Sequence, residues 1–347
     1  MTTTKIVWRV SLAVAMATAP ACVATVSSVG PYVMVMATQR EIQKAADRGY
    51  RLAPLPGSPW MGGLCLQKVD SPDPVEYLVL SAQRTGTMVR EMNEAGAKGF
   101  RFARGGPVRA VMQRNNGITT GDYEYGILAA ALLETLEGEL RVEATKGFHV
   151  VEASLTGHTL MGGDHFFLVL ERPGPAKGID ARQYRILSTA RATTFELELQ
   201  QAADEGYRLN PRLELKPGGA LVEKRADVVE PLEYRVLSTS HTGTLQAELN
   251  SASTEGYRFA AVFSGVLSGA LRGSQLAVIM QRKKGSVTRT HEHVLLATSR
   301  FATMQRELPL ELAKGFQLVG QTIFDPPGIL GVTPVEYVAI LERGIQE

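Results

Sequence analysis

The sequence predicts an α+β protein made of six strand-helix-strand-strand repeats, whose antiparallel sheets carry helices on one face. Three observations predict this fold. A glycine followed by Tyr or Phe ends a helical pattern six times, the two halves of the chain align at constant offsets, and each repeat changes from strand to helix periodicity. The six glycines are Gly49, Gly99, Gly147, Gly206, Gly256 and Gly315.

The six repeats form two duplicated blocks of three. The glycines of units one and four, and of units two and five, are 157 residues apart, and those of units three and six are 168 apart. Units one and four also share Gln-x-Ala-Ala-Asp-x-Gly-Tyr-Arg-Leu. Such offsets indicate duplication of a supersecondary unit. We therefore expect a first block at 30–172, a Pro- and Gly-containing linker at 173–180, and a second block at 181–343.

Each repeat is expected to begin with a strand, continue as a helix and end in a hairpin. In unit two, residues 76–80 have the period of two that a strand requires. Met88, Met92 and Ala95 then follow at the i, i+4, i+7 spacing of an apolar helix face. The glycine fits the C′ position, where a positive φ costs little without a Cβ, and the aromatic residue then packs near C3. We interpret the repeated dipeptide as a helix stop with a hydrophobic contact.

Two units depart from this pattern. Residues 27–31 give unit one no evident first strand, so its sheet is expected to be incomplete or completed by residues elsewhere. Pro309 lies inside the helical stripe of unit six and predicts a helix that bends or starts late. Because each helix covers one sheet face while several strands are apolar on both faces, as at 166–170, we expect the units to pack against each other.

The repeat resembles a small bacterial module known only as a domain of unknown function. Members of that family read Tyr-x-Val-Leu, then Glu-x-Leu-Asn with Gly-x-x-Gly-Trp, then a hairpin ending in Lys-Arg. The best matching copy here has residues 234–237, 248–250, 256–257 and 280–282, with Tyr in place of the usual Trp. The resemblance extends over roughly residues 35–343 by the repeat bounds. It implies a βαββ fold and carries no activity, cofactor or catalytic residues.

Composition limits the classes of function. The chain has 347 residues, 44% hydrophobic and 21% charged, which suits a folded protein of two or three domains. Its formal charge of +2 falls to about zero if the basic N-terminus is removed. A near-neutral protein without a basic cluster interleaved with aromatic residues is not expected to bind nucleic acid.

The N-terminus has the organisation of a secretory signal peptide. Lys5 and Arg9 precede an apolar run at 10–19 and a small-x-small site, which predicts a signal at 1–21. Cys22 follows directly and resembles the acylated cysteine of bacterial lipoproteins, although Ala replaces the usual Leu three residues earlier. An uncleaved anchor is the alternative, because the uncharged stretch after Arg9 is long enough to cross a bilayer. We expect an exported protein of the periplasm or cell envelope, with lipidation at Cys22 left open.

The second cysteine, Cys65, falls in an apolar strand opposite Val222 of the duplicate unit, so we interpret it as a buried core residue. A disulfide with Cys22 is the alternative in an exported protein. Two cysteines without a short spacing exclude a cysteine-based zinc motif.

The sequence lacks the common fingerprints of catalysis and names no cofactor. It has no nucleophile elbow, phosphate-binding loop, dinucleotide motif or His-Glu-x-x-His. His291 and His293 lie two apart on an expected strand and face one side, which could begin a metal site, but they provide only two ligands. His149, His158 and His165 are gathered in unit three. We favour ordinary structural roles for all five and expect no metal.

Two further groups of charged residues have a functional and a structural interpretation. Glu143 and Glu311 replace the alanine of other units at C3, and could form a carboxylate pair for acid/base chemistry or simply be solvated. A basic residue after the Gly-aromatic step could bind an acidic polymer or lipid headgroups. We favour local pairing of these side chains. They are Arg51, Arg101, Arg208 and Arg258.

An insertion in unit five is the best candidate for a specialised element. It makes the unit 11 residues longer than its twin, and its glycines recur every four residues within an apolar segment. That pattern suits either a partner or membrane contact or a neutral lengthening of a hairpin tip. The candidate contact residues are Gly265, Leu267, Gly269, Leu271 and Gly273.

Two hypotheses of function follow from these observations. The first is a non-enzymatic exported cell-envelope protein that acts as a scaffold or binding module, with an unidentified protein or envelope component as partner. The second is an enzyme or small-ligand-binding protein with a site between the two blocks. The unit-three histidines or the Glu143 and Glu311 pair would supply that site.

Overall fold

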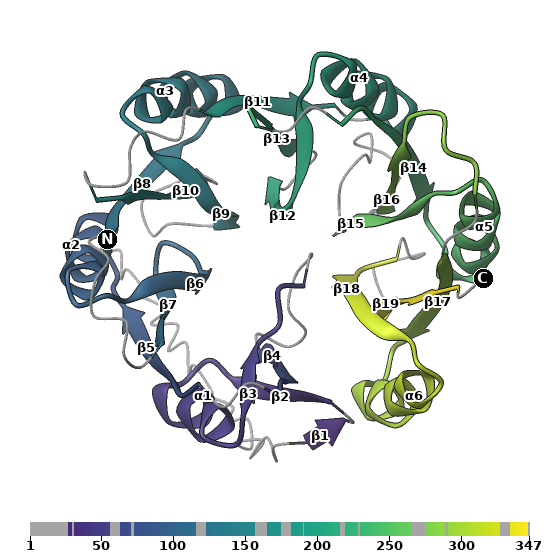
Figure 1. Ribbon diagram of the computed structural model, residues 1–347, viewed down its shortest axis with the longest axis horizontal. Helices are drawn as coiled ribbons and strands as arrows, with labels where there is room; N and C mark the ends of the chain where they lie inside the picture. Colours follow the sequence, from purple (N-terminus) through teal and green to yellow (C-terminus); the bar gives the residue numbers. More distant parts are fainter. Residues whose placement is uncertain are drawn as a thin grey trace, which may run out of the picture.

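Six βαββ units form a closed ring, with the helices on the outside and the strands toward the centre (Figure 1). The computed structural model describes residues 27–29, 31–55, 63–70, 73–115, 123–156, 165–174, 182–189, 191–215, 219–227, 230–264, 275–288, 291–326 and 334–345. The predicted α+β repeat architecture is confirmed. Strands β6, β9, β12, β15 and β18 reach nearest to the centre of the ring.

The first three units follow one another along the chain. Unit one comprises β1 (Ser27–Val29), β2 (Tyr32–Met36), α1 (Gln39–Ala46), β3 (Tyr50–Leu52) and β4 (Gly63–Lys68). Unit two comprises β5 (Val75–Ser81), α2 (Thr85–Gly96), β6 (Arg101–Gly105) and β7 (Arg109–Asn115). Unit three comprises β8 (Tyr123–Ala130), α3 (Leu133–Thr145), β9 (His149–Thr156) and β10 (His165–Pro173).

The remaining units repeat the same order. Unit four comprises β11 (Arg182–Ser188), α4 (Ala192–Asp204), β12 (Arg208–Leu215) and β13 (Gly219–Arg225). Unit five comprises β14 (Leu232–Thr239), α5 (Thr242–Thr254), β15 (Arg258–Ser264) and β16 (Leu276–Lys283). Unit six comprises β17 (His291–Thr298), α6 (Phe301–Ala313), β18 (Gln317–Phe324) and β19 (Glu336–Gly344).

Every sheet is antiparallel and places its last strand in the middle. The order in unit five, for example, is β14-β16-β15, so the strand before the helix and the strand after it are the two edges. The strand after the helix is the one that points toward the axis, and we call it the inner strand of its unit (Figure 1). Each sheet therefore has one edge at the axis and one edge facing the preceding unit.

The helices end as the sequence predicts. All six glycines of the repeat have φ between 80° and 91°, a region that is cheap only without a Cβ. The next amide closes the Schellman hydrogen bond, as from Phe100 N to the Ala95 carbonyl (3.1 Å) and from Tyr207 N to the Ala202 carbonyl (2.8 Å). The repeated Gly-aromatic step is thus a helix terminator.

A basic residue at the end of each unit completes this helix stop. The Arg282 guanidinium carbon lies 4.4 Å from the Tyr257 ring centroid, while its Nη1 donates to the Glu255 carbonyl at 2.6 Å. The cation therefore covers the aromatic residue and satisfies a carbonyl at the negative helix end. The equivalent side chains make the same two contacts: Lys68, Arg114, Arg172, Lys224 and Arg343.

Helices α1 to α5 also cover the exposed edge of the next unit's first strand. In α1, the Gln43 amide accepts from Tyr77 N (3.0 Å) and donates to the Val75 carbonyl (3.2 Å). Gln39, one turn earlier, accepts from Val79 N at 2.7 Å. Side-chain amides can pair with both backbone groups of a strand, so they saturate an edge that would otherwise invite aggregation. The amides of Asn93, Gln200 and Gln246 act in the same way on β8, β14 and β17. The carboxylates of Glu137 and Glu196 accept one backbone N–H each from β11 and β14.

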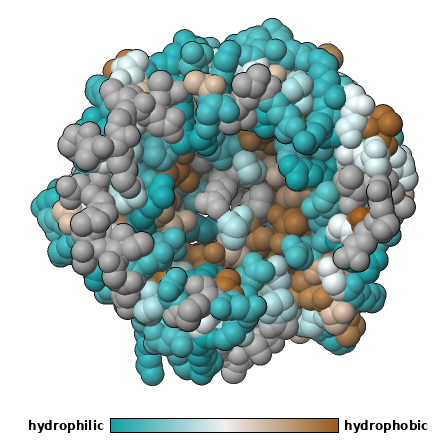
Figure 2. Space-filling view, in the orientation of Figure 1, coloured by the Kyte–Doolittle hydropathy of each residue, from teal (hydrophilic) through white to brown (hydrophobic). Residues whose placement is uncertain are grey.

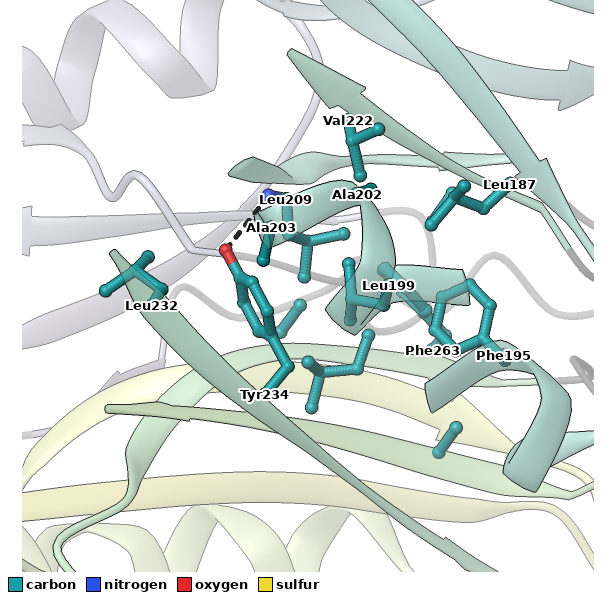
Figure 3. Packing of buried hydrophobic residues seen from close by; sticks show 14 residues of the cluster. Leu187, Phe195, Leu199, Ala202, Ala203, Leu209, Val222, Leu232, Tyr234 and Phe263 are labelled. Carbon is teal, nitrogen blue, oxygen red and sulfur yellow. Dashed lines mark hydrogen bonds between the residues drawn. The ribbon is translucent and has the colours of Figure 1, made fainter. Parts of the chain in front are cut away.

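The hydrophobic core lies between units rather than within them. Figure 3 shows the cluster shared by units four and five, where Phe195 and Leu199 of α4 pack with Tyr234 of β14 and Phe263 of β15. The Tyr234 hydroxyl accepts from Leu209 N at 3.1 Å. Each of the six described clusters joins two consecutive units. The expectation that the units pack against each other is confirmed.

The ring closes between units six and one by a different device. The expectation that unit one lacks a first strand was wrong, because Tyr32–Met36 forms it and pairs with β4. Strand β1 pairs with the other edge of β2, at Val29↔Tyr32 through Ser27↔Met34, and contacts α6. One cluster joins Tyr32 and Cys65 to Met304 and Leu308 of α6. A backbone strand therefore covers the edge that helix side chains cover elsewhere.

Pro309 is one difference at this seam. It stands six residues before its glycine, at the position that Gln43, Asn93 and Gln200 occupy in their helices, and proline has no amide to cap β2. Contrary to the expectation of a late start, α6 begins at Phe301, in register with Leu133 of α3 168 residues earlier, and continues through Pro309. The proline replaces a capping side chain rather than interrupting the helix.

Candidate functional site

A cleft opens near the axis of the ring. Its volume is about 470 Å³, and it is lined by the inner strands of units one to four and the segment after β3. Figure 2 shows the face of the ring hollowed at its centre, with hydrophobic residues on the wall and hydrophilic residues around the outside. The charged lining residues are Arg101, Arg104, Glu152 and Glu171. The cleft thus combines apolar walls with charges of both signs, as small-molecule sites do.

A β-bulge in each of two inner strands directs these charges into the cleft. In β6, Arg101 pairs with Gln113 and Arg104 with Val111, so the bulge falls between Phe102 and Arg104. Without the extra residue, side chains three apart would point to opposite faces. In β9, His149 pairs with Glu171 and Glu152 with Val169, which leaves an equivalent extra residue. Each bulge therefore brings two polar side chains to the same sheet face.

Glu171 is the most deeply buried charge of the cleft wall. Its side chain is fully buried, and it accepts from Arg101 Nε at 2.8 Å and from the Tyr125 hydroxyl at 3.0 Å. Burial raises the pKa of Glu171, but its contacts with His149 and Arg101 outweigh it and leave the pKa below its ordinary value. Burial and the Glu171 charge raise the pKa of Tyr125. The carboxylate is thus held ionised between units two and three.

Of the three unit-three histidines, the structure brings one into this cluster. His149 Nε2 lies 3.6 Å from Glu171 Oε1, and its buried Nδ1 has no hydrogen-bond partner among the described residues. His165 begins β10, and its side chain is outside the description. His158 lies outside the described residues altogether. Sequence reasoning noted His149 but missed Glu171, whose pairing with Arg101 depends on the packing of two units.

The two histidines of β17 converge as their spacing predicts. His293 Nε2 lies 2.9 Å from Glu342 Oε2, and His291 Nε2 lies 3.6 Å from Glu342 Oε1. His293 Nδ1 is 2.6 Å from the Ser253 hydroxyl, which completes a serine-histidine-glutamate chain. Ser253 is 1% exposed and the His293 side chain is 0% exposed. No substrate reaches the buried Ser253 hydroxyl. The series Ser253–His293–Glu342 is therefore a buried polar network between units five and six.

This network replaces a tyrosine. At four other junctions, a first-strand tyrosine hydroxyl accepts from the inner strand of the preceding unit, as Tyr125 does from Phe102 N at 3.0 Å. His293 stands at that position in unit six, and Glu342 Oε2 accepts from Phe259 N at 3.1 Å instead. Burial raises the pKa of Glu342, and its contacts with both histidines bring it below the ordinary value. The role is therefore cohesion of the ring.

The carboxylate pair considered for acid/base chemistry does not form. Glu143 lies in α3 and Glu311 in α6, on opposite sides of the ring (Figure 1). Each pairs with a lysine three residues later, Lys146 at 2.7 Å and Lys314 at 2.8 Å. The hypothesis of a joint site was wrong, because duplicated units occupy opposite positions in a six-membered ring.

Three of the arginines after the Gly-aromatic step have partners within the protein, two of them backbone carbonyls and one a carboxylate of the next unit. Arg51 Nη1 donates to the Ala46 carbonyl at 3.1 Å, and Arg208 donates to the Glu230 carbonyl. Arg101 binds Glu171. Arg258, the fourth, is exposed at the start of β15. These contacts stabilise helix ends and unit junctions.

The remaining sequence candidates fall partly outside the description. Cys22 and the insertion residues Gly265, Leu267, Gly269, Leu271 and Gly273 lie outside the described residues. Cys65 is 6% exposed in β4, and burial raises the pKa of its thiol to about 12, which makes it an unreactive core residue. Val222, its counterpart in unit four, is fully buried.

Two kinds of feature are absent from the part of the chain that the structure describes. None of the helices described is long and apolar enough to cross a membrane. Within the same part of the chain, no three His, Cys, Asp or Glu side chains are grouped so that they could hold a metal ion. The chain matches no protein-family model, no curated protein and no solved structure. The resemblance to the small βαββ module of unknown function therefore stays a prediction.

Proposed function

We propose that this protein is a non-enzymatic, exported component of the cell envelope that acts as a ring-shaped scaffold or binding module. One observation carries the proposal. The buried ionisable groups described above, Glu171 and Glu342 with their partners, are bonded across junctions between units, so their chemistry is used to hold the ring together. The basic, apolar and small-x-small N-terminus supports export.

Attachment at Cys22 would hold the ring close to a membrane. Strand β1 begins five residues after Cys22, and an extended chain spans at most about 3.6 Å per residue. A lipid on Cys22 would therefore lie within about 18 Å of the seam between units six and one. One or two acyl chains are enough to keep an otherwise soluble protein at a bilayer.

The test is the mature N-terminus of the full chain expressed in a bacterium that processes lipoproteins. We expect mass spectrometry to find an acylated Cys22 as the first residue, and fractionation to place the protein with membranes. The matched variant Cys22→Ser should lose the acyl mass and leave the membrane fraction. An intact Met1 in a cytosolic fraction of the wild type would contradict the proposal.

A second candidate function, small-ligand binding, is favoured by the cleft. Its lining comes from units one to three and from Asn210 and Pro211 of unit four, so residues of both predicted blocks meet there. A test that needs no ligand is labelling of Ala103→Cys, a half-buried lining position, with a small thiol reagent. Rapid modification of the variant, against slow modification of the buried Cys65 in the wild type, is expected for an open cleft. Protection of the new thiol would contradict it.

A further inference from the structure

We propose that the axial cleft binds a small zwitterion, a free amino acid or short peptide, whose carboxylate pairs with Arg104 and whose ammonium group pairs with Glu152. The inference deepens the ligand-binding candidate above and rests on it. It follows from a comparison of the six units at one position, five residues after the glycine of each Gly-aromatic step.

That position distinguishes units two and three from the rest. Its residues in chain order are Pro54, Arg104, Glu152, Pro211, Ala261 and Gly320. Four units thus form the repeat with proline or a small residue there. A partly buried charge carries a desolvation cost, so the two charges are not required by the architecture. They are of opposite sign and come from neighbouring units.

On the opposite side of the axis, the equivalent positions are packed closed. The Phe259 ring lies so near Gly320 that a Cβ built there would be 2.4 Å from its Cζ. The Ser264 and Thr322 hydroxyls are 3.1 Å apart, and both residues are buried. Among the described residues, units five and six are thus closely packed at these positions, whereas Arg104 and Glu152 line a cleft.

The other two charges of the cleft neutralise each other. Arg101 and the buried Glu171 form an ion pair at 2.8 Å, which fixes the wall of the cleft. Arg104 Nη1 donates to the Leu55 carbonyl at 3.1 Å, which orients a guanidinium that has five N–H donors in all. Arg104 and Glu152 also make other contacts within the protein, so a ligand would exchange partners with them.

Size and polarity fit a zwitterion better than a larger partner. The volume of about 470 Å³ falls within the range of about 300–1,000 Å³ for small-molecule sites. Guanidinium groups recognise carboxylates through paired hydrogen bonds, and a carboxylate recognises an ammonium group by charge. Leu52, Val150 and Val151 supply apolar wall for a short aliphatic side chain.

The experiment uses trialanine and two blocked forms of it as probes. Calorimetric titration of the mature protein should show binding of trialanine, at least tenfold weaker binding of N-acetyl-trialanine, which lacks the ammonium group, and equally weakened binding of trialanine amide, which lacks the carboxylate. Equal binding of trialanine and either blocked form would overturn the proposal, because the cleft would then recognise a simple anion or cation. Failure of all three to bind would also overturn it.

Two variants assign the roles. Arg104→Gln should weaken the binding of trialanine at least tenfold and leave the binding of trialanine amide, which has no carboxylate, unchanged. Glu152→Gln should weaken the binding of trialanine at least tenfold and leave the binding of N-acetyl-trialanine, which has no ammonium group, unchanged. Arg90→Gln, on the exposed side of α2, is the matched control and should bind like the wild type. Melting curves confirm that each variant folds. If Ala103→Cys is labelled but trialanine does not bind, the ligand class is wrong; if it is also protected, the cleft itself is closed.

Discussion

Replacement of Tyr234 by Phe tests whether the junctions between units hold the ring through buried hydrogen bonds. Tyr234 is 4% exposed and Leu209 is 7% exposed, and the hydroxyl accepts from Leu209 N at 3.1 Å. Phe keeps the ring of the side chain and its packing, so no cavity forms. The change leaves a buried N–H without its acceptor, which costs about 1–3 kcal/mol.

The assay is chemical denaturation of the wild type and variant, followed by circular dichroism. We expect the midpoint to fall by an amount equivalent to about 1–3 kcal/mol at an unchanged slope. Tyr207→Phe is the control within the same unit, because its hydroxyl makes a long 3.4 Å contact with Gln183 at the surface. Its effect should stay within about 0.5 kcal/mol. Equal midpoints for the two variants would refute the role assigned to Tyr234.

Three further outcomes follow from the structure. The pKa of Glu171 is lower in the folded protein, so its ionisation stabilises the fold above the ordinary carboxyl pKa of 4.5. This stabilisation disappears as the pH falls through the lower pKa of the folded state. The melting temperature of Glu171→Gln should therefore depend less on pH in that window than the melting temperature of the wild type. Gly320→Ala should lower the free energy of unfolding by about 1–3 kcal/mol, because the new Cβ would clash with Phe259. Gly138→Ala, with nothing within 4 Å of the new Cβ, should raise the free energy of unfolding by about 0.5–1 kcal/mol. Calorimetry that finds changes of the same sign for both variants would contradict this reasoning. Removal of β1 should expose the edge of β2 and cause self-association in light scattering, and a monodisperse truncated protein would count against its role as the closing strand.

The helices and their stops could be read from the sequence because they depend on local chemistry. Gly99 sets a positive φ, Phe100 closes the Schellman bond to Ala95, and Met88 and Met92 form the apolar stripe, all within one unit. The first strand of unit one was missed because β2 starts one residue after the segment considered. The apolar residues of β2 also continue the uncharged stretch that follows Arg9, so they did not stand out as a separate strand.

The site could be predicted only in part. His291 and His293 converge on Glu342 because a strand's period of two places them on one face. The pairing of Arg101 with Glu171 lies 70 residues apart in the chain and depends on how two units meet. The direction of Arg104 depends on a bulge, and one extra residue in a strand reverses every side chain beyond it.

The sequence by itself determined the repeat, its duplication, and the strand-helix-hairpin order, because periodicity and the Gly-aromatic stop act over a few residues. The tertiary structure alone decided that six units close into a ring, since each unit lacks a core until its neighbour covers it. Closure placed Glu143 and Glu311 on opposite sides and gathered Arg104 and Glu152 at the axis. Neither placement could be predicted from the spacing of these residues in the sequence, because the curvature of the ring arises from contacts between units.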